Sequence, residues 1–146
     1  MTDYVISSDP GWIDIEVVWR FLSEESYWAR DVPRETIIKS LAHSISFGVY
    51  QLGPGSLRKQ VGFARVVTDQ ATFAYLADVF ILGDHRGQGL SKRLLEAVLA
   101  HPELQGLRRW LLFTADAHKL YEQFGFAPTG YPERIMEIRL PYVSDQ

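Results

Sequence analysis

The chain has 146 residues, a length that fits one domain with a hydrophobic core of its own. It is 47% hydrophobic and 23% charged with a formal net charge of −3, which is typical of a globular protein and unlike the basic surface of a nucleic-acid binder. It has no cysteine, which excludes disulfides, thiolate metal sites and cysteine nucleophiles and is compatible with a reducing cytoplasm.

The sequence also argues against secretion and membrane insertion. The first ten residues include an acidic residue and lack the basic and apolar regions of a signal peptide, so we expect none. No apolar run approaches the roughly 20 residues needed to cross a bilayer. We therefore expect a cytoplasmic protein that folds as a single domain over residues 1–146, with neither nucleic acid nor a membrane as its partner.

Two helices are expected in the first third of the chain. Apolar residues recur at helical spacing from Ile15 to Leu22, directly after Asp14, whose side chain suits the N-cap of a helix. Pro33 suits the start of a second helix, whose expected apolar face consists of Ile37, Ile38 and Leu41.

Three strands are expected next. Residues 46–52 predict a strand that ends at the turn-forming sequence Gly53-Pro54-Gly55. Residues 60–68 and 72–82 predict two more strands, and the short polar link between them predicts an antiparallel hairpin.

The second half of the chain alternates helices and strands. A helix is expected from Leu90 to the break at His101-Pro102. Residues 108–114 predict a strand whose centre is too apolar for an exposed edge, and Gly125 closes a short helix after it. A last strand is expected over residues 135–140. This order indicates a mixed α/β or α+β domain whose sheet is covered on both faces.

The segment between residues 79 and 95 carries the clearest functional signal. A buried strand runs into Arg86-Gly87-Gln88-Gly89, and a helix begins directly after it. Glycines let a ligand approach the backbone, and the first turn of a helix offers unpaired N–H groups to an anion. The segment therefore predicts a phosphate or pyrophosphate site, to which Arg86 adds charge and Ser91 a hydroxyl. A plain glycine-containing turn between a strand and a helix is the alternative interpretation.

Two common nucleotide motifs do not fit this segment. A Walker loop requires Lys and then Ser or Thr after its last glycine, whereas Gly89 is followed by Leu90. A Rossmann fingerprint requires a third glycine where this chain has Lys92. A nucleotide binder unrelated to acyl transfer is therefore disfavoured.

From Asp78 onward the same segment resembles the acetyl-CoA-binding motif of the GNAT superfamily of N-acetyltransferases, a strand followed by (Q/R)xxGxG and a helix. Gly87 and Gly89 match the glycines of the motif, and Arg86 is the usual residue before the first one. Asp84 stands where the family has Gln or Arg, so its side chain is not counted as a phosphate ligand.

A second stretch supports the same family. The sequence TADAHKLYEQFGF, from Thr114 to Phe126, resembles the NxxAxxLYxxxGF segment of the superfamily, with Thr114 in place of the common Asn. Two motifs in the right order are more specific than either alone.

The resemblance implies a GNAT fold: a mixed, mostly antiparallel sheet of about six to seven strands, flanked by about four helices and splayed open around acetyl-CoA. It implies acetyl-CoA as the acetyl donor and no metal, and the four histidines show no metal-ligand spacing. The residues implied to bind acetyl-CoA are Val79, Phe80, Ile81, Arg86, Gly87, Gln88, Gly89, Leu90, Ser91, Thr114 and Ala117.

Tyr121 is implied to be the general acid, because the tyrosine at this position of the family motif donates a proton or a hydrogen bond to the departing sulfur of CoA. A phenol fits this role because its pKa, near 10, keeps it protonated at neutral pH. The alternative is that Tyr121 packs against Phe124 with its hydroxyl bonded to a backbone group.

Asp78 is the candidate general base, acting directly or through a water. An acid within the apolar run YLADVFIL costs free energy unless it is paired or functional. An ion pair with Arg65 on the neighbouring strand explains Asp78 equally well, and Tyr75 and Glu35 are weaker candidates for the base. Alternation along a strand places Asp78 on one face with Leu76 and Phe80, opposite Val79 and Ile81.

The acceptor pocket of the family is built largely by the N-terminal helices and the loop between them. Here that loop offers charged residues beside aromatic ones, a combination that suits a cationic amine: Glu24, Tyr27, Trp28 and Arg30. Packing in the core explains Trp28 about equally well.

By resemblance, the chain is identified as an acetyl-CoA-dependent N-acetyltransferase. It is expected to transfer an acetyl group to a primary amine of a small molecule or peptide by direct attack in a ternary complex, since no activated nucleophile is visible. The alternative is a non-catalytic module that binds CoA or an acyl-CoA. Homodimers are common in the family, so a second copy of the chain is one expected partner.

Overall fold

The computed structural model describes residues 3–142, and its centre is a sheet of five strands in the order β1-β2-β3-β4-β5. The first four strands pair antiparallel in sequence order, whereas β5 runs parallel to β4 and needs a helical crossover. The strands are β1 (Tyr4–Ser7), β2 (Ile45–Leu52), β3 (Arg58–Thr68), β4 (Phe73–Ile81) and β5 (Arg109–Leu112).

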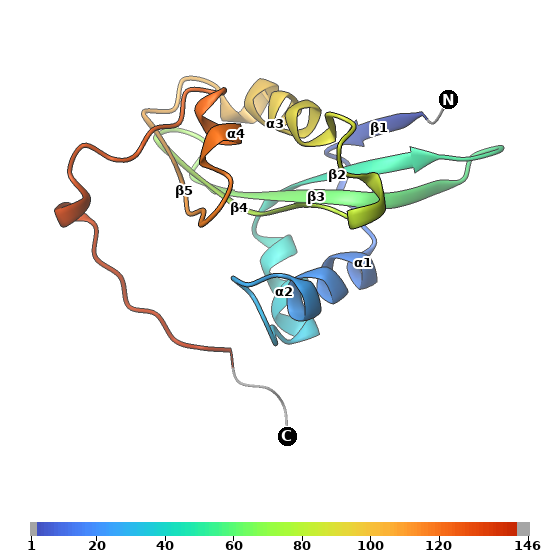
Figure 1. Ribbon diagram of the computed structural model, residues 1–146, viewed down its shortest axis with the longest axis horizontal. Coiled ribbons are helices and arrows are strands. Elements are labelled where there is room, and N and C mark those ends of the chain that lie inside the picture. Colours follow the sequence, from blue (N-terminus) through green and yellow to red (C-terminus); the bar gives the residue numbers. More distant parts are fainter. Residues whose placement is uncertain (1–2, 143–146) are drawn as a thin grey trace.

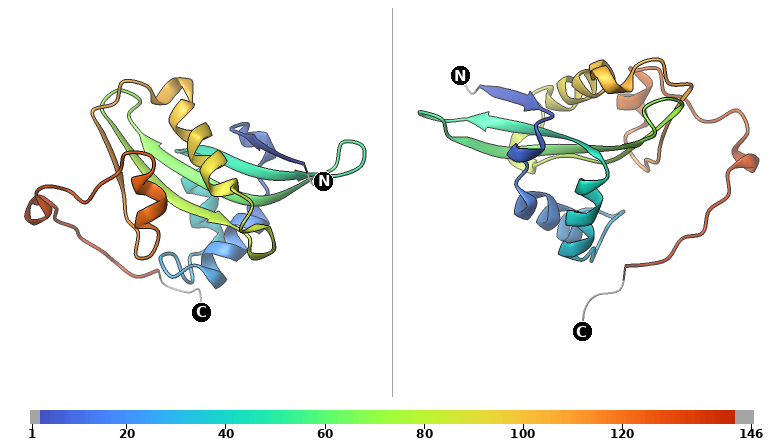
Figure 2. Two further views of the ribbon diagram at one scale, coloured as in Figure 1. Left: turned by 45° about the horizontal axis from the view of Figure 1, so that its top comes forward. Right: turned by 180° about the vertical axis from the view of Figure 1, so that it is seen from behind.

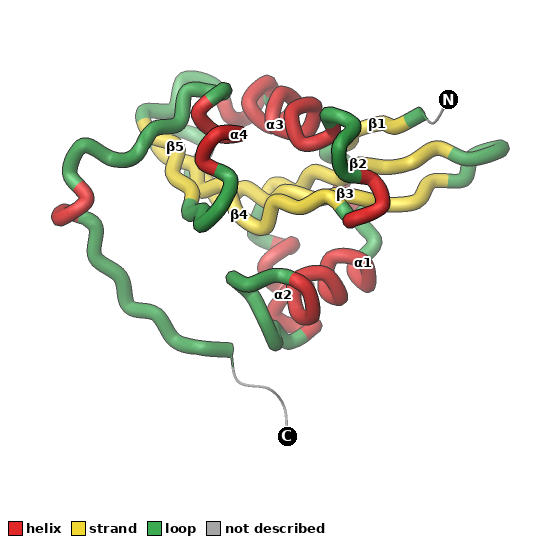
Figure 3. The backbone as a smooth tube through the Cα atoms, viewed as in Figure 1, coloured by secondary structure: helices red, strands yellow, loops and turns green. Residues whose placement is uncertain are grey.

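Helices cover both faces of this sheet (Figure 1). Helices α1 (Ile15–Arg20) and α2 (Arg34–Ala42) lie on one side, and α3 (Leu90–Ala100) and α4 (His118–Glu122) lie on the other (Figures 2 and 3). The sheet therefore separates two apolar cores, one under α3 and one against α1 and α2. No helix within residues 3–142 is long and apolar enough to cross a membrane.

The turns of the central meander form where the sequence predicts them. Gly55 has a φ of 68° in the turn between β2 and β3, a conformation that favours glycine. Between β3 and β4, the Asp69 carboxylate accepts hydrogen bonds from the Thr72 hydroxyl and from the N–H groups of Ala71, Thr72 and Phe73. These bonds lower the pKa of Asp69 and hold the hairpin closed.

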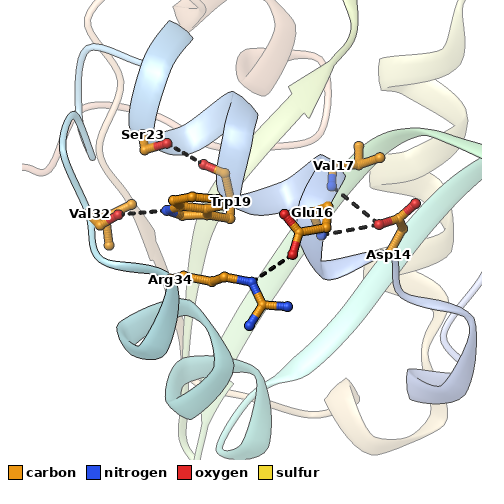
Figure 4. Close-up of polar contacts among 7 residues, drawn as sticks. All are labelled: Asp14, Glu16, Val17, Trp19, Ser23, Val32 and Arg34. Carbon is orange, nitrogen blue, oxygen red and sulfur yellow. Dashed lines mark hydrogen bonds and ion pairs between the residues drawn. The ribbon is translucent and has the colours of Figure 1, made fainter.

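Local hydrogen bonds attach the N-terminal helices to each other (Figure 4). The Asp14 carboxylate caps α1 by accepting from the N–H groups of Glu16 and Val17, as expected for this position. The indole of Trp19 donates to the Val32 carbonyl at 3.0 Å, which fixes the loop that leads into α2. Arg34 pairs with Glu16 at 2.7 Å, but both side chains are largely exposed, so this pair contributes only about 0–1 kcal/mol.

Several expectations about the sheet are wrong. The described residues form five strands rather than six to seven, because residues 135–140 are extended but pair with no strand. Residues 109–112 form the edge strand β5, although an apolar centre favoured an interior strand. On α2, Ile37 is buried and Leu41 packs against the core, whereas Ile38 is exposed.

The backbone of β2 leaves no room for a side chain at Gly48. A Cβ at this position would overlap the hydroxyl and ring of Tyr50, which lies on the same face two residues further on and is buried. We expect Gly48→Ala to lower the free energy of unfolding by about 1–3 kcal/mol, the usual cost of overpacking, as measured by urea unfolding.

Gly53→Ala is the control for this variant. A Cβ at position 53 would meet the Leu57 Cβ at 3.5 Å, an ordinary contact. Equal losses in the two variants would show that the Tyr50 ring does not impose the requirement for glycine at position 48.

Candidate active site

Strand β4 loses its neighbour β5 halfway along its length. The two strands pair only from Phe73 and Arg109 to Leu76 and Leu112, whereas β4 continues to Ile81. The side of residues 77–81 that faces away from β3 therefore has no strand partner within the described chain. An extended ligand can pair there with main-chain groups, as expected for Val79, Phe80 and Ile81.

A β-bulge lies in this unpaired part of β4. Phe63 pairs with Phe80 and Arg65 with Ala77, so that Asp78 and Val79 together face a single residue of β3. Asp78 takes a left-handed conformation with a φ of 57°, which Asp tolerates better than most residues.

The bulge overturns the alternation expected around Asp78. Leu76 packs in the same core as Val79 and Ile81, under α3, whereas Phe80 packs in the core against α1 and α2. The sequence pattern placed Leu76 on the face of Asp78 because it contained no sign of an inserted residue.

The Asp78 carboxylate is held by two donors. The Arg65 Nε donates to its Oδ2 at 2.8 Å, and the Trp28 Nε1 donates to its Oδ1 at 2.9 Å. The side chains of Arg65 and Asp78 are 17% and 10% exposed, so water screens this pair far less than a surface pair. The ion pair foreseen with Arg65 is therefore present. The hydrogen bond from Trp28 ties the segment between α1 and α2, here called the N-terminal loop, to the bulge.

The glycine loop leads from the end of β4 into α3. Gly87 and Gly89 have φ values of 79° and 76°, and a Cβ at either position would meet no protein atom within 4 Å. Gly89 is the N-cap of α3, and no side chain caps this helix, in contrast to α1. The N–H groups of the first turn of α3 are therefore available to an anion.

The other residues of the loop are placed as follows. The Leu90 side chain is buried in the core, so only its N–H can face a ligand, and Ser91 is partly exposed. The Arg86 Nε donates to the Ile81 carbonyl at 2.9 Å, which folds its side chain back onto the end of β4. Gln88 donates to the Tyr4 hydroxyl at 3.3 Å.

Tyr121 lies on the inner side of α4 and is 9% exposed. Its ring contacts Phe126 edge-on, at 5.9 Å between centroids, and no described residue forms a hydrogen bond with its hydroxyl. Burial, followed by the nearby Tyr27 and Asp116, raises the pKa of Tyr121 to about 12. The phenol is therefore protonated throughout the physiological range.

The loop before α4 contains the two remaining residues expected to bind acetyl-CoA. The Thr114 Oγ1 accepts from the Ala117 N–H at 3.0 Å, which shapes the turn into the helix. On the other side of this loop, the Tyr27 hydroxyl accepts from the Ala115 N–H at 2.8 Å. This bond joins the N-terminal loop to the β5–α4 loop across 88 residues of sequence.

Asp78 and Tyr121 line the same cavity, which has a volume of about 120 Å³. Its walls come from the N-terminal loop, from β4 at the bulge and from the β5–α4 loop, and none of its lining residues is Lys, Arg or His. A second cavity, of about 250 Å³, lies between β5 and α4 and shares Phe113, Thr114 and Tyr121 with the first. The lining residues of the smaller cavity are Tyr27, Trp28, Tyr75, Leu76, Ala77, Asp78, Val79, Phe113, Thr114, Asp116, Ala117 and Tyr121.

Some expected acceptor residues lie elsewhere. Tyr27 and Trp28 line the cavity, but Glu24 and Arg30 do not, and the Arg30 guanidinium donates to the Glu24 carbonyl at 3.4 Å. Glu35, a weaker candidate for the general base, does not line the cavity either. Conversely, sequence reasoning missed Phe113 and Asp116, although Asp116 lies within the motif that contains Tyr121. Tyr75, a weaker candidate, also lines the cavity, and burial followed by the Asp78 carboxylate raises its pKa.

Metal-binding residue types do not gather here. Within residues 3–142, no group of three or more His, Cys, Asp or Glu side chains is arranged to hold a metal ion.

Comparison with known proteins connects this geometry to a family. A family model for the GNAT acetyltransferase domain matches residues 45–128. A protein of Gibberella zeae that is assigned as an acetyltransferase is 33% identical, over 82% of this chain and 76% of its own length.

Solved structures show the same similarity. The crystal structure of a protein from Xanthomonas campestris pv. campestris, assigned to the GNAT family, is 45% identical and has a TM-score of 0.89, covering 100% of this chain and 99% of its own. An acetyltransferase of Clostridium acetobutylicum, solved with acetyl-CoA, shares the fold at 14% identity with a TM-score of 0.66, covering 95% of this chain and 96% of its own.

The two ion pairs of the described structure allow a matched comparison. Arg65→Gln leaves the Asp78 carboxylate in a poorly hydrated place without its cation, so we expect unfolding free energy to fall by about 2–4 kcal/mol. Arg34→Gln breaks an exposed pair and should cost less than about 1 kcal/mol. Urea unfolding of both variants measures the difference, and similar losses would mean that the Arg65–Asp78 pair does not stabilise the bulge.

Proposed function

Because this chain belongs to the GNAT acetyltransferase family, we propose that it is an acetyl-CoA-dependent N-acetyltransferase acting on a primary amine of a small molecule or peptide. The whole chain, residues 1–146, works as a single domain. Acetyl-CoA and the amine bind together, and the amine attacks directly. The cytoplasm is the proposed location, in keeping with a chain that has no cysteine.

The observation that carries this proposal is the position of Tyr121. Tyr121 lines a cavity that also contains Asp78 and that lies beside the unpaired part of β4. A proton donor, a carboxylate and an open strand edge therefore meet in one place, which is what transfer of an acyl group from an extended thioester to an amine requires.

The residues present fit acetyl-CoA. Gly87 and Gly89 leave open space where a side chain would stand, and the uncapped first turn of α3 suits the pyrophosphate, with Leu90 and Ser91 offering N–H groups. Arg86 and Gln88 flank these glycines. The main chain of Val79, Phe80 and Ile81 would pair with the pantetheine arm, and Thr114 and Ala117 would line the opposite side.

When bound, acetyl-CoA supplies an activated acetyl thioester. Tyr121 donates its phenolic proton to the sulfur that leaves, and its raised pKa ensures that the proton is present. Asp78 takes the proton of the attacking amine, directly or through a water. The guanidinium of Arg65 and the indole of Trp28 hold this carboxylate in one orientation.

The cavity composition favours an acceptor that carries positive charge before it reacts. Two carboxylates, Asp78 and Asp116, line the cavity together with aromatic rings, and no basic side chain competes with the substrate. Trp28 and Tyr27 stand edge to face at 5.0 Å, which presents an aromatic surface to an ammonium group.

Removing the Tyr121 hydroxyl tests the general acid. We expect Tyr121→Phe to lower kcat at least tenfold, about 1.4 kcal/mol of barrier or more, while acetyl-CoA affinity changes little. The rate is followed by thiol release and the affinity by calorimetry. Tyr50→Phe is the control, because Tyr50 is also buried with a pKa raised to about 12 but lies outside the cavity. Equal rates in Tyr121→Phe and the parent protein would remove the assignment.

Adding a side chain to the glycine loop tests the coenzyme site. Gly89→Val should abolish acetyl-CoA binding in calorimetry, because the new side chain occupies the space left for the pyrophosphate. Gly106→Val is a matched control, since Gly106 has a similar φ of 71° and equally open surroundings but lies far along the chain. Unchanged binding by Gly89→Val would contradict the proposed loop geometry.

A non-catalytic module that binds CoA or an acyl-CoA is the second candidate function. Calorimetric titration with acetyl-CoA, using ATP and NAD as controls, detects binding in either case. Thiol release with a panel of amines separates the two: binding without any release would favour the module, and release would favour the enzyme. The presence of Tyr121 beside Asp78 in the lining of one cavity favours the enzyme.

A further inference from the structure

The glycine loop, residues 86–89, has little to hold it in shape from within. Gly87 and Gly89 have no side chain, and both have positive φ values, which glycine adopts about as readily as negative ones. The bond from the Arg86 Nε to the Ile81 carbonyl fixes only the start of the loop. A loop of this kind needs support from another part of the chain if it is to be ordered before a ligand binds.

Strand β1 gives this support from the other end of the fold. It lies beside the start of α3 (Figure 1). Its first residue is Tyr4, whose ring is partly buried against the core under α3. The Tyr4 hydroxyl forms a hydrogen bond with the His85 Nδ1 at 2.8 Å and accepts one from the Gln88 Nε2 at 3.3 Å. Since these partners are 81 and 84 residues away in sequence, no local pattern indicates the contact.

The backbone of Tyr4 is attached to the same region. Arg93, in the first turn of α3, donates from its Nη2 to the Tyr4 carbonyl at 3.1 Å. The rings of Tyr4 and His85 meet edge-on, with their centroids 5.8 Å apart. His85 ends the short 3-10 turn that follows β4, and Gln88 lies between the two glycines. Tyr4 therefore contacts the chain before, within and after the glycine loop.

The Tyr4 hydroxyl uses both its oxygen and its proton in these bonds. The Gln88 amide nitrogen donates to the oxygen, which leaves the phenolic proton to be donated to the His85 Nδ1. This direction requires the imidazole tautomer that carries its proton on Nε2. The three side chains thus form one directed chain of hydrogen bonds, from Gln88 through Tyr4 to His85, in which each bond polarises the next.

We propose that Tyr4 is a positioning residue of the coenzyme site, and that it holds the glycine loop, through His85 and Gln88, in the conformation that receives the pyrophosphate. This inference rests on the proposed function, because acetyl-CoA is the ligand that the loop would bind. The Tyr4 hydroxyl is already occupied by two protein groups, so Tyr4 acts through them. A loop that is ordered in advance loses less conformational entropy when the ligand binds.

A purely structural role for Tyr4 is the competing explanation, because its ring packs against the core under α3. Tyr4→Phe separates the two roles, since it keeps the ring and removes only the hydroxyl. A structural role predicts lower stability with unchanged coenzyme affinity. A positioning role predicts weaker coenzyme affinity in a protein that is still folded.

The first test measures binding. We expect Tyr4→Phe to weaken acetyl-CoA binding in calorimetry by about tenfold, because part of the binding free energy is then used to order the loop. In turnover with one fixed amine, the KM for acetyl-CoA should rise by a similar factor, while kcat at saturating acetyl-CoA stays the same.

Tyr50→Phe is the control for this test. Tyr50 lies opposite Val5 of β1, and its buried hydroxyl has no hydrogen-bond partner among the described residues. Removing this hydroxyl therefore breaks no bond and should leave the affinity unchanged. Equal affinities in Tyr4→Phe and Tyr50→Phe would overturn the positioning role. Failure of the parent protein to bind acetyl-CoA would instead contradict the proposed function.

The second test needs no ligand, so it decides the role of Tyr4 in either case. Backbone amide relaxation by NMR should give lower order parameters for residues 87–89 in Tyr4→Phe than in Tyr50→Phe. His85→Phe removes the partner of the Tyr4 hydroxyl and should have a similar effect. The double variant should add little, because both changes break the same bond. Unchanged order parameters in Tyr4→Phe, or fully additive effects of the two changes, would overturn the proposal.

Discussion

The carboxylate of Asp78 connects three parts of the chain that are distant in sequence. It stands at the bulge of β4, where it accepts hydrogen bonds from Arg65 on β3 and from Trp28 in the N-terminal loop. Because the carboxylate is poorly hydrated, water cannot replace either donor, and losing one of them would cost free energy. The loop is in turn fixed to the β5–α4 segment by the bond from the Ala115 N–H to Tyr27. The walls of the cavity are therefore joined by polar contacts of two adjacent residues in one loop, Tyr27 and Trp28.

The end of β4–β5 pairing at Leu76 has a different physical consequence. A sheet normally satisfies the main-chain groups of a strand on both sides, and here one side of β4 is left open next to an uncapped helix N-terminus. Both features leave main-chain groups without protein partners, which raises the free energy of the unliganded protein. An extended ligand with a phosphate end would supply partners for both. In the proposed function, this combination would let a small GNAT domain bind a long coenzyme without a deep pocket, and Tyr121, the proposed general acid, lines the cavity beside the open part of β4.

Residues 135–140 and the edge of β5 likewise leave apolar side chains and main-chain groups without a partner in the described chain. An apolar edge strand is a template for pairing with another chain, and natural proteins cover or blunt such edges. This chain carries a segment with the complementary pattern outside its own fold.

The sequence by itself determined the local features of this protein. Asp14 as a helix cap, the hairpin between β3 and β4, and the turn and helix after β4 each depend on residues within a few positions, so composition and spacing were sufficient. The roles expected for the glycine loop and for Tyr121 came from the resemblance to the GNAT motifs. Glu24 and Arg30 were assigned to the acceptor pocket by their loop alone, and neither of them lines the cavity that contains Asp78 and Tyr121. The bulge at Asp78, the entry of Asp116 and Phe113 into the cavity and the edge position of β5 were decided only by the tertiary structure. The reason is physical: these features arise from contacts such as Trp28–Asp78, 50 residues apart, and from pairing that residues 135–140 do not make within their own chain. Periodicity reports which face of an element is apolar, but it does not report which distant surface covers that face.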